Sequence, residues 1–354
     1  MTTDDSRFAT DPADVVPGRA TLPEGWSLGT PTEADTPRLA ELRRAHEIHG
    51  RGWAGTSEAD VRIEVSGPGL PTRAHIVIRD AEGGIRAWGS VHDRAEGRML
   101  YADVIDRDLP HDVAGCCSEL LLAWGEAQAR EVGAARGLAV QQIDTGAFAE
   151  DDRQHRWLAA AGFEHVRTWW QMSRPVAASE AELVADPEHW ERAGVTFRLV
   201  RLTDSDLPEE GDLRAVHDVL EGAFADHFNS REESFDEFLG RLREDPGHRW
   251  DHWWLADLDG VGPVGALVGS HVESADGPDG SYVDYLGVLE QARGRGVAKG
   301  LLNTIIADAA ARGRNRVGLE VDADSPTGAE GLYVAMGWQT AYVTQSWHRD
   351  VPVT

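Results

Sequence analysis

A glycine-rich turn between an expected strand and an expected helix is the clearest chemical feature of this chain. Residues 282–288 read as a strand, and an amphipathic helix is predicted to begin near Val297. Between them, Gln291 is followed by Gly294 and Gly296. Glycine lets backbone N–H groups turn inward, and a helix N-terminus adds partial positive charge. The turn therefore predicts a pyrophosphate-binding loop that needs no lysine.

Other phosphate-binding loops have different sequences. A Rossmann turn requires G-x-G-x-x-G with an acidic residue after the next strand, and a Walker loop requires G-x-x-x-x-G-K-[ST]. Residues 291–296 match neither pattern. Dinucleotides and nucleoside triphosphates are therefore less favoured as ligands.

The turn resembles motif A of the GNAT N-acetyltransferases, Q/R-x-x-G-x-G/A, which binds the pyrophosphate of acetyl-coenzyme A. A helix at 297–313 and a strand at 316–322 are expected to follow in the family's order. The run from Ser325 to Trp338 is similar to the family's N-x-x-A-x-x-L-Y-x-x-x-G-F, with serine in place of asparagine and tryptophan in place of phenylalanine. The resemblance implies an acetyl-CoA-dependent N-acetyltransferase.

The resemblance also implies roles for single residues. Tyr333 is expected beside the thioester sulfur as a proton donor, although its pattern alone also fits a core aromatic. The backbone N–H of Val288 is the expected oxyanion donor. Asp284 shares a strand face with Tyr282, so it is a candidate base or a charge that shapes the substrate site. The expected coenzyme contacts are Leu286, Gly287, Val288, Arg293, Gly294, Arg295, Gly296, Val297, Ala298 and Ser325.

The acceptor pocket of such domains is built by the first two helices and their loop. Asp226 and His227 lie in that loop, and with Tyr282 they are the expected contacts to a cationic amine. Gly287 lies inside the strand, where a glycine marks a bulge, a close approach or a simple packing gap. No metal site is expected, because His46 and His49 do not match H-E-x-x-H and lack a third ligand.

The elements that must position these residues occur twice. Residues 101–103 parallel 282–284 at an offset of 181, and 161–163 parallel 336–338 at an offset of 175. A repeat of this length indicates a duplicated domain. Each copy reads β-α-α-β-β-β-α-β-α-β, which predicts a mixed α/β (α+β) fold with a mostly antiparallel sheet flanked by helices.

The two copies differ in their chemistry. Where the second copy has its glycine turn, the first has three aspartates and a proline over residues 106–112. The residue of the first copy that corresponds to Tyr333 is Leu158, which has no hydroxyl. We therefore expect a degenerate first copy and a catalytic second copy. The expected boundaries are a disordered tail at 1–23, a degenerate GNAT domain at 24–175, a linker at 176–194 and a catalytic GNAT domain at 195–354.

Composition limits the partners. The chain has 34 basic and 61 acidic residues and a net charge of -27, which disfavours nucleic acid and anionic membranes. The charge either attracts cationic small molecules or only keeps the protein soluble. No apolar run approaches the ~18 residues of a membrane span, so a cytoplasmic location is expected. The sequence leaves open whether the protein is a monomer or a homodimer. Cys116 and Cys117 are neighbours in an expected helix, and reduced thiols are expected there.

The tandem arrangement resembles the mycothiol synthase-like group of two-domain GNAT proteins, although in mycothiol synthase the phosphate-loop region is recognisable in both copies. The expected reaction moves the acetyl group of acetyl-CoA to a primary amine of a small cationic metabolite or antibiotic, by direct attack in a ternary complex. Two alternatives remain open. They are mycothiol synthase-type acetylation in thiol biosynthesis and a non-catalytic acyl-CoA binding or sensor protein.

Overall fold

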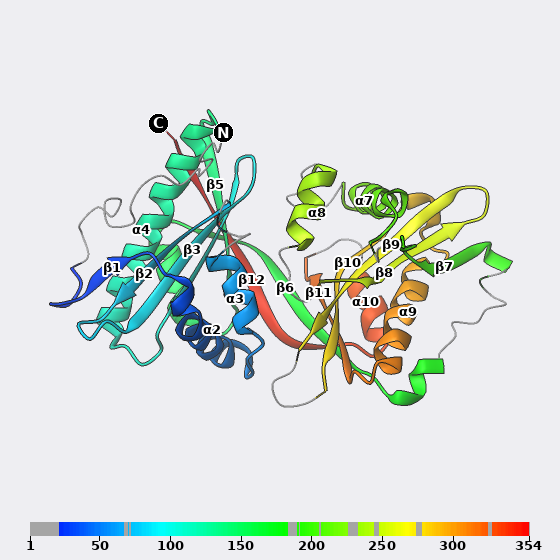
Figure 1. The fold of residues 1–354 in the computed structure, drawn as a ribbon, viewed down its shortest axis with the longest axis horizontal. Helices are drawn as coiled ribbons and strands as arrows, with labels where there is room; N and C mark the ends of the chain where they lie inside the picture. Colours follow the sequence, from blue (N-terminus) through cyan, green and yellow to red (C-terminus); the bar gives the residue numbers. More distant parts are fainter. Residues whose placement is uncertain are drawn as a thin grey trace. The chain divides into compact units, whose positions relative to one another are not determined.

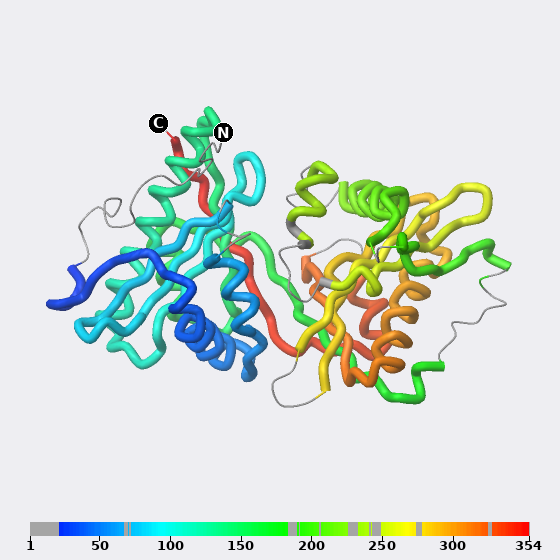
Figure 2. The backbone as a smooth tube through the Cα atoms, in the orientation of Figure 1, coloured from blue at the N-terminus to red at the C-terminus, as the bar shows by residue number. Residues whose placement is uncertain are grey.

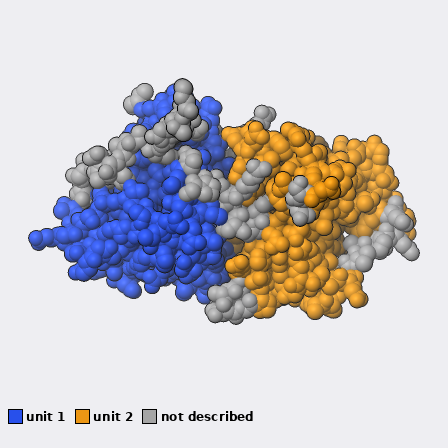
Figure 3. Space-filling model, in the orientation of Figure 1, with its two compact units in different colours: residues 1–169, 342–354 blue, residues 170–341 orange. Residues whose placement is uncertain are grey.

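The strands and helices of the computed structural model belong to two compact units. Unit 1 comprises residues 1–169 and 342–354, and unit 2 comprises residues 170–341 (Figure 3). The structure describes residues 21–66, 70, 72–182, 190, 192–204, 207–225, 233–243, 248–273, 278–324 and 328–353. Within these ranges the strands form one mixed sheet with helices on its faces (Figure 1). The predicted mixed α/β fold is confirmed.

Unit 1 follows the predicted order of elements. Its strands are β1 (Ser27–Gly29), β2 (Arg73–Arg79), β3 (Ile85–Ala95), β4 (Arg98–Ile105), β5 (Val140–Phe148) and the first half of β6 (Glu164–Pro175). Its helices are η1 (Glu33–Asp35), α2 (Thr36–Arg51), α3 (Glu58–Val65), α4 (His111–Ala135) and α5 (Asp152–Ala160). Strands β1 to β4 pair antiparallel, whereas β4 and β5, which α4 connects, are parallel.

Unit 2 repeats this order, as the tube in Figure 2 shows. Its strands are β7 (Val195–Leu199), β8 (His248–Leu258), β9 (Gly262–Val272), β10 (Gly280–Val288), β11 (Arg316–Asp322) and the start of β12 (Gln339–Pro352). Its helices are η3 (Ala178–Glu182), α7 (Glu210–Phe224), α8 (Phe235–Arg243), η4 (Glu290–Ala292), α9 (Val297–Ala311) and α10 (Ala329–Ala335). The parallel pair is β10 and β11, which α9 connects as predicted.

Apolar side chains place the helices of unit 2 on two faces of the sheet. On α7, Leu213, Val216 and Leu220 follow the helical period and pack on the face that α8 also covers. Leu301 and Ile305 of α9 pack on the other face, where α10 adds partly buried side chains. The strands of unit 2 are therefore covered by α9 and α10 on one face and by α7 and α8 on the other.

The last strands of the two copies are exchanged. The order in the sheet is β1-β2-β3-β4-β5-β12-β6-β11-β10-β9-β8-β7. In unit 1, β12 lies antiparallel beside β5, from Thr344↔Phe148 to Pro352↔Val140. In unit 2, β6 is the neighbour of β11. Each copy therefore supplies the strand that completes the sheet of the other, which the linear boundaries at 175 and 195 do not express.

Candidate active site

The glycine turn between β10 and α9 has the backbone that the sequence predicts. Gly294 and Gly296 have φ angles of 75° and 78°, in the left-handed region that glycine adopts without strain. Gly296 is the N-cap of α9. In the described chain, the first N–H of α9 with a protein partner is that of Gly300, which donates to the Gly296 carbonyl at 3.0 Å. The earlier N–H groups are available to an anion at the positive end of the helix.

Close packing fixes the start of α9. A Cβ at Gly300 would lie 2.1 Å from the ring of Phe197, so only glycine lets that ring sit against the helix. The Phe197 ring meets Trp190 edge-on, with centroids 4.8 Å apart. Trp190 in turn lies next to Gly296. The aromatic pair therefore supports the turn from the side of the sheet core.

Strands β10 and β11 separate at their carboxyl ends. Their parallel pairing ends at Val283↔Leu319, although β10 continues to Val288 and β11 to Asp322. The facing edges beyond these residues are not paired with each other. Unpaired backbone N–H and C=O groups on a strand edge can bond to the amides of an extended ligand. This geometry fits a pantetheine chain that runs from the glycine turn along β10.

A β-bulge in β10 sets the direction of Asp284. The register of β10 against β9 shifts at this residue, which is therefore the extra residue of the bulge. The Ser270 hydroxyl of β9 donates to the Asp284 carboxylate at 3.2 Å. Gly287 has a different role, because a Cβ there would lie 2.9 Å from the Cβ of Ala223. Its lack of a side chain lets α7 approach the sheet closely.

Tyr333 lies on α10, on the α9 side of the sheet. Its ring packs beside Leu332 and Met336 against the core below α9, 6.1 Å from the ring of Trp338. Burial raises the pKa of the Tyr333 hydroxyl, so the phenol keeps its proton at neutral pH. A core position for the ring and a donor role for the hydroxyl are therefore compatible.

Polar side chains of β10 and β11 face the side of α7 and α8. Glu320 and Asp322 point to this side, because the alternate residues of β11 lie in the core below α9. Tyr282 lies on the same side, since a Cβ at Gly318 would be 2.9 Å from its ring. Asp284 lies on this side as well, because it accepts a hydrogen bond from Ser270, the β9 residue that is paired with Tyr282. The acceptor side of the separated strands is therefore acidic.

Sequence reasoning missed Glu320 and Gln171. Gln171 lies on β6 and donates from Nε2 to the Glu320 carboxylate. The Tyr282 hydroxyl donates to Gln171 Oε1 at 3.3 Å. Glu320 is exposed, yet surrounding protein atoms desolvate its carboxyl and raise its pKa; the Gln171 hydrogen bond opposes this rise, and Asp322 adds to it. The polar position in the strand pattern of 316–322 is the signal that could have selected Glu320.

The other predicted site residues fall into two groups. Leu286 and Val288 pack at the margin of the core below α9, Val297 is buried at the start of that helix, and Arg293 and Arg295 are exposed on the turn. These residues, with Ala298 and Tyr333, come from the elements that flank the separated strands. Three predicted residues lie outside the described residues: Asp226, His227 and Ser325.

The matching turn of unit 1 holds ion pairs instead of glycines. The Asp106 carboxylate accepts a hydrogen bond from Arg38 at 2.9 Å. Arg107 forms an ion pair with Asp151 at the start of α5. Pro110 precedes α4 and, as an imino acid, has no N–H to offer an anion. In unit 1, paired charged side chains therefore occupy the region that corresponds to the open glycine turn of unit 2.

The register of β4 corrects the sequence parallel between the copies. Pairing of the parallel strands ends at Tyr101↔Thr145 in unit 1 and at Val283↔Leu319 in unit 2. Tyr101 therefore corresponds to Val283, and the predicted match to Tyr282 is wrong by one residue. The reason is that β-strand side chains alternate between faces, and Tyr101 packs in the core below α4 as Val283 does below α9.

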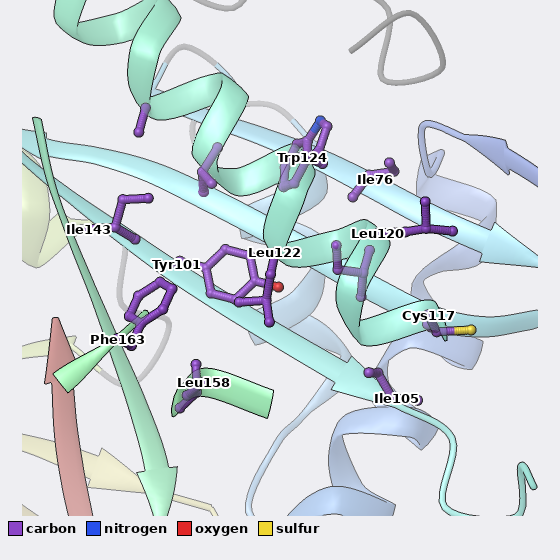
Figure 4. Close-up of a cluster of buried hydrophobic side chains, with 14 of the residues drawn as sticks. Ile76, Tyr101, Ile105, Cys117, Leu120, Leu122, Trp124, Ile143, Leu158 and Phe163 are labelled. Carbon is purple, nitrogen blue, oxygen red and sulfur yellow. The ribbon is translucent and has the colours of Figure 1, made fainter. Parts of the chain in front are cut away.

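Asp103 consequently faces the opposite side from Asp284. It follows Tyr101 by two residues on an unbulged stretch of β4, so it points toward α4 and α5. Gln154 of α5 donates to it at 3.4 Å, and burial raises its pKa to about 6. Leu158, at the position of Tyr333, is buried in the same core as Tyr101 (Figure 4).

Across the described ranges, no group of three His, Cys, Asp or Glu side chains is arranged to hold a metal ion. No described helix is both long and apolar enough to cross a membrane. Cys116 and Cys117 both lie on α4 as free thiols.

Comparison with known proteins identifies the domain that carries the site. Residues 213–338 match the model of the acetyltransferase (GNAT) family. Among curated proteins, none matches the chain in sequence. The match spans α7 to Trp338 and so includes the glycine turn, the separated strands and Tyr333.

Solved structures share the fold over most of the chain. A GCN5-related N-acetyltransferase from Sphaerobacter thermophilus is 23% identical, with a TM-score of 0.70 over 94% of this chain and 98% of its own. A tandem GNAT protein from the clavulanic acid biosynthesis pathway is 12% identical, with a TM-score of 0.64 over 93% and 99%. N-myristoyltransferase from Saccharomyces cerevisiae is 9% identical, with a TM-score of 0.58 over 96% and 82%.

These likenesses agree with the site geometry. The fold is that of tandem GNAT proteins, and the family match lies in the unit with the open glycine turn. Residues 213–338 of unit 2 therefore match the acetyltransferase (GNAT) family, and the chain shares the fold of tandem GNAT proteins.

Proposed function

We propose that the protein transfers the acetyl group of acetyl-CoA to the primary amine of a small cationic metabolite or antibiotic. The separation of β10 and β11 beyond Val283 and Leu319 carries this proposal. It lies next to the glycine turn, with Tyr333 on the α9 side of the sheet and Asp284 on the α7 side. A thioester in the gap and an amine on the α7 side would meet there without a covalent enzyme intermediate.

The residues of unit 2 fit a bound acetyl-CoA. The N–H groups from Gly294 to Ala298 would hold its pyrophosphate, and the edge of β10 from Leu286 to Val288 would bind its pantetheine amides. The bound coenzyme supplies the activated acetyl group. Tyr333 would donate a proton to the departing sulfur, and the Val288 N–H would stabilise the carbonyl oxygen.

Charge on the acceptor side supports a cationic amine. Asp284, Glu320 and Asp322 face this side of the sheet, and Tyr282 lies among them. Carboxylates near an ammonium group favour its binding through Coulomb attraction that surrounding protein strengthens. The net charge of -27 attracts the same class of molecule at longer range.

Mycothiol synthase-type acetylation is the second candidate, and its support is the tandem fold. Its acceptor would be the amine of a thiol precursor. A non-catalytic acyl-CoA sensor would need the same glycine turn but would have no use for a buried proton donor such as Tyr333. The cytoplasmic location and the monomeric or homodimeric state stay predictions from the sequence.

A thiol-release assay with Tyr333→Phe tests the proposal. A panel of polyamines, aminoglycosides, amino-acid-derived amines and amines of thiol precursors is offered with acetyl-CoA. We expect release of coenzyme A with at least one cationic amine. We expect kcat to fall by about 10²-fold in Tyr333→Phe, because a positioned proton donor contributes on that order.

The same variant distinguishes catalysis from simple binding. Acetyl-CoA affinity should be unchanged in Tyr333→Phe, since the hydroxyl is assigned to the chemical step and not to the pyrophosphate. Tyr342→Phe in unit 1 is the matched control and should keep full activity. A wild type that binds acetyl-CoA but acetylates no amine would favour the sensor.

A further inference from the structure

Two carboxylates flank the separated strands on the acceptor side of unit 2. Parallel pairing ends at Val283↔Leu319, so Asp284 and Glu320 are the next residues on β10 and β11. Both face α7, as the bond from Ser270 and the alternation of β11 require. An amine that approaches a thioester between the strands from the α7 side would meet carboxylates on both strands.

The two carboxylates have different surroundings. Asp284 accepts a hydrogen bond from the Ser270 hydroxyl, and this bond fixes the orientation of the carboxylate. Glu320 accepts one from Gln171, whose amide oxygen accepts in turn from the Tyr282 hydroxyl. This chain of bonds holds the Glu320 side chain from β6 while leaving it exposed to solvent.

We infer that Glu320 removes the proton from the acceptor ammonium, that Gln171 positions it, and that Asp284 holds the positive charge of the amine. This inference rests on the proposed function. The residues with a role then lie on β10, on β11 and on the unit 2 part of β6.

The proton balance of the step is closed. Glu320 takes one proton from the ammonium, and the neutral nitrogen forms a C–N bond to the acetyl carbon as the C–S bond breaks. Tyr333 gives its proton to the departing sulfur and regains one from the nitrogen. Glu320 then releases its proton to solvent, so the net products are an amide, the free thiol and one proton.

The groups around Glu320 define the expected pH dependence. Desolvation and Asp322 raise the pKa of Glu320, and the bond from Gln171 lowers it. Tyr282 and Asp284 face it from β10, and on the unit 2 part of β6 the charged residue is Arg174, which pairs with Glu180. A base with a raised pKa is active only above that pKa. The pH profile of activity should therefore have a rising limb, and its midpoint should lie above the usual pKa of glutamate.

The test is the pH profile of kcat/KM for the best amine of the panel. Glu320→Gln should lower kcat by about 10²-fold and remove the limb, with recovery at high pH where the free amine is abundant. Gln171→Ala should move the limb to higher pH, because it removes the bond that lowers the pKa. A residue with only a structural role would not shift the limb.

Controls separate this role from folding and from coenzyme binding. Glu273→Gln changes another exposed glutamate of unit 2 and should keep the wild-type profile. Glu320→Gln should bind acetyl-CoA as the wild type does, and Glu320→Asp should keep part of the limb. Asp284→Asn should raise KM and keep the limb.

Two outcomes overturn the assignment. A wild-type limb in Glu320→Gln together with its loss in Asp284→Asn would make Asp284 the base. A wild type that acetylates no amine contradicts the proposed function itself, and the assignment fails with it. The first result leaves the proposed function intact, so the two failures are distinguishable.

Discussion

The half-buried carboxyl group of Asp103 shows how single residues differ between the copies. Asp103 lies in the interior of unit 1 with Gln154 as its hydrogen-bond partner, and burial raises its pKa to about 6. Above that pH the folded protein holds an ionised carboxyl in desolvated surroundings. Below the ordinary value of 3.8, folded and unfolded chains both carry the protonated acid. The cost of Asp103 therefore appears as pH rises from about 4 to about 6.

Asp103→Asn should stabilise the protein at pH 7.5. The amide has the same shape and no charge, so the gain in the free energy of unfolding should be on the order of 2 kcal/mol. The gain should fall to about a third of that value at pH 4.5, where the carboxyl is still mostly ionised in the unfolded chain but protonated in the folded one. Urea unfolding at the two pH values measures it, with Asp108→Asn, an exposed neighbour on the same turn, as the control. An equal gain at both pH values would contradict the raised pKa.

Residue types alone predict part of the site. Gly294 and Gly296 are selected by the need for positive φ, and Tyr333 by its spacing from Gly337. Glu320 and Gln171 are not, because their contact depends on β6 lying beside β11. A pattern along one strand states which residues share a face. It does not state which distant strand lies beside them.

At the scale of elements, the periodicity of the sequence predicts where strands and helices lie in the chain better than it predicts which of them are neighbours in the sheet. The pattern of residues 316–322 predicts β11 with its observed bounds, and the helix expected from Val297 is α9, which ends at Ala311. The exchange of β6 and β12 is invisible to this pattern. Either strand has the alternation needed to complete either sheet, so the choice depends on long-range packing.

A disulfide across β5 and β12 tests the exchange. Gln142 and Asp350 are direct partners in the antiparallel register, and such pairs are about 4.5 to 5.5 Å apart at Cα, within disulfide range. We expect Gln142→Cys with Asp350→Cys to cross-link within one chain on oxidation. Peptide mapping by mass spectrometry identifies the linked segments.

An off-register pair is the matched control for that cross-link. Gln142→Cys with Thr344→Cys places the second thiol six positions away along β12, about 20 Å at 3.4 Å per residue. This pair should stay reduced within the chain. Equal cross-linking of both pairs, or none in the register pair, would contradict the pairing of β12 with β5.

The whole molecule is a duplication whose two copies differ at the turn before the helix that connects their parallel strands. Unit 2 has the open glycine turn, the bulge at Asp284 and Tyr333, whereas unit 1 has ion pairs at Asp106 and a buried Leu158. The sequence predicts this asymmetry from the loss of glycines. We therefore propose that unit 1 is structural.

Counting the coenzyme sites on the intact chain tests this account most directly. Calorimetric titration of acetyl-CoA should give one saturable site per chain. The double variant Gly294→Val, Gly296→Val should abolish it, while the double variant Gly260→Val, Gly262→Val, with comparable positive φ angles in the β8–β9 turn, should keep it. Two sites, or one site that survives the change at Gly294 and Gly296, would contradict a single coenzyme domain.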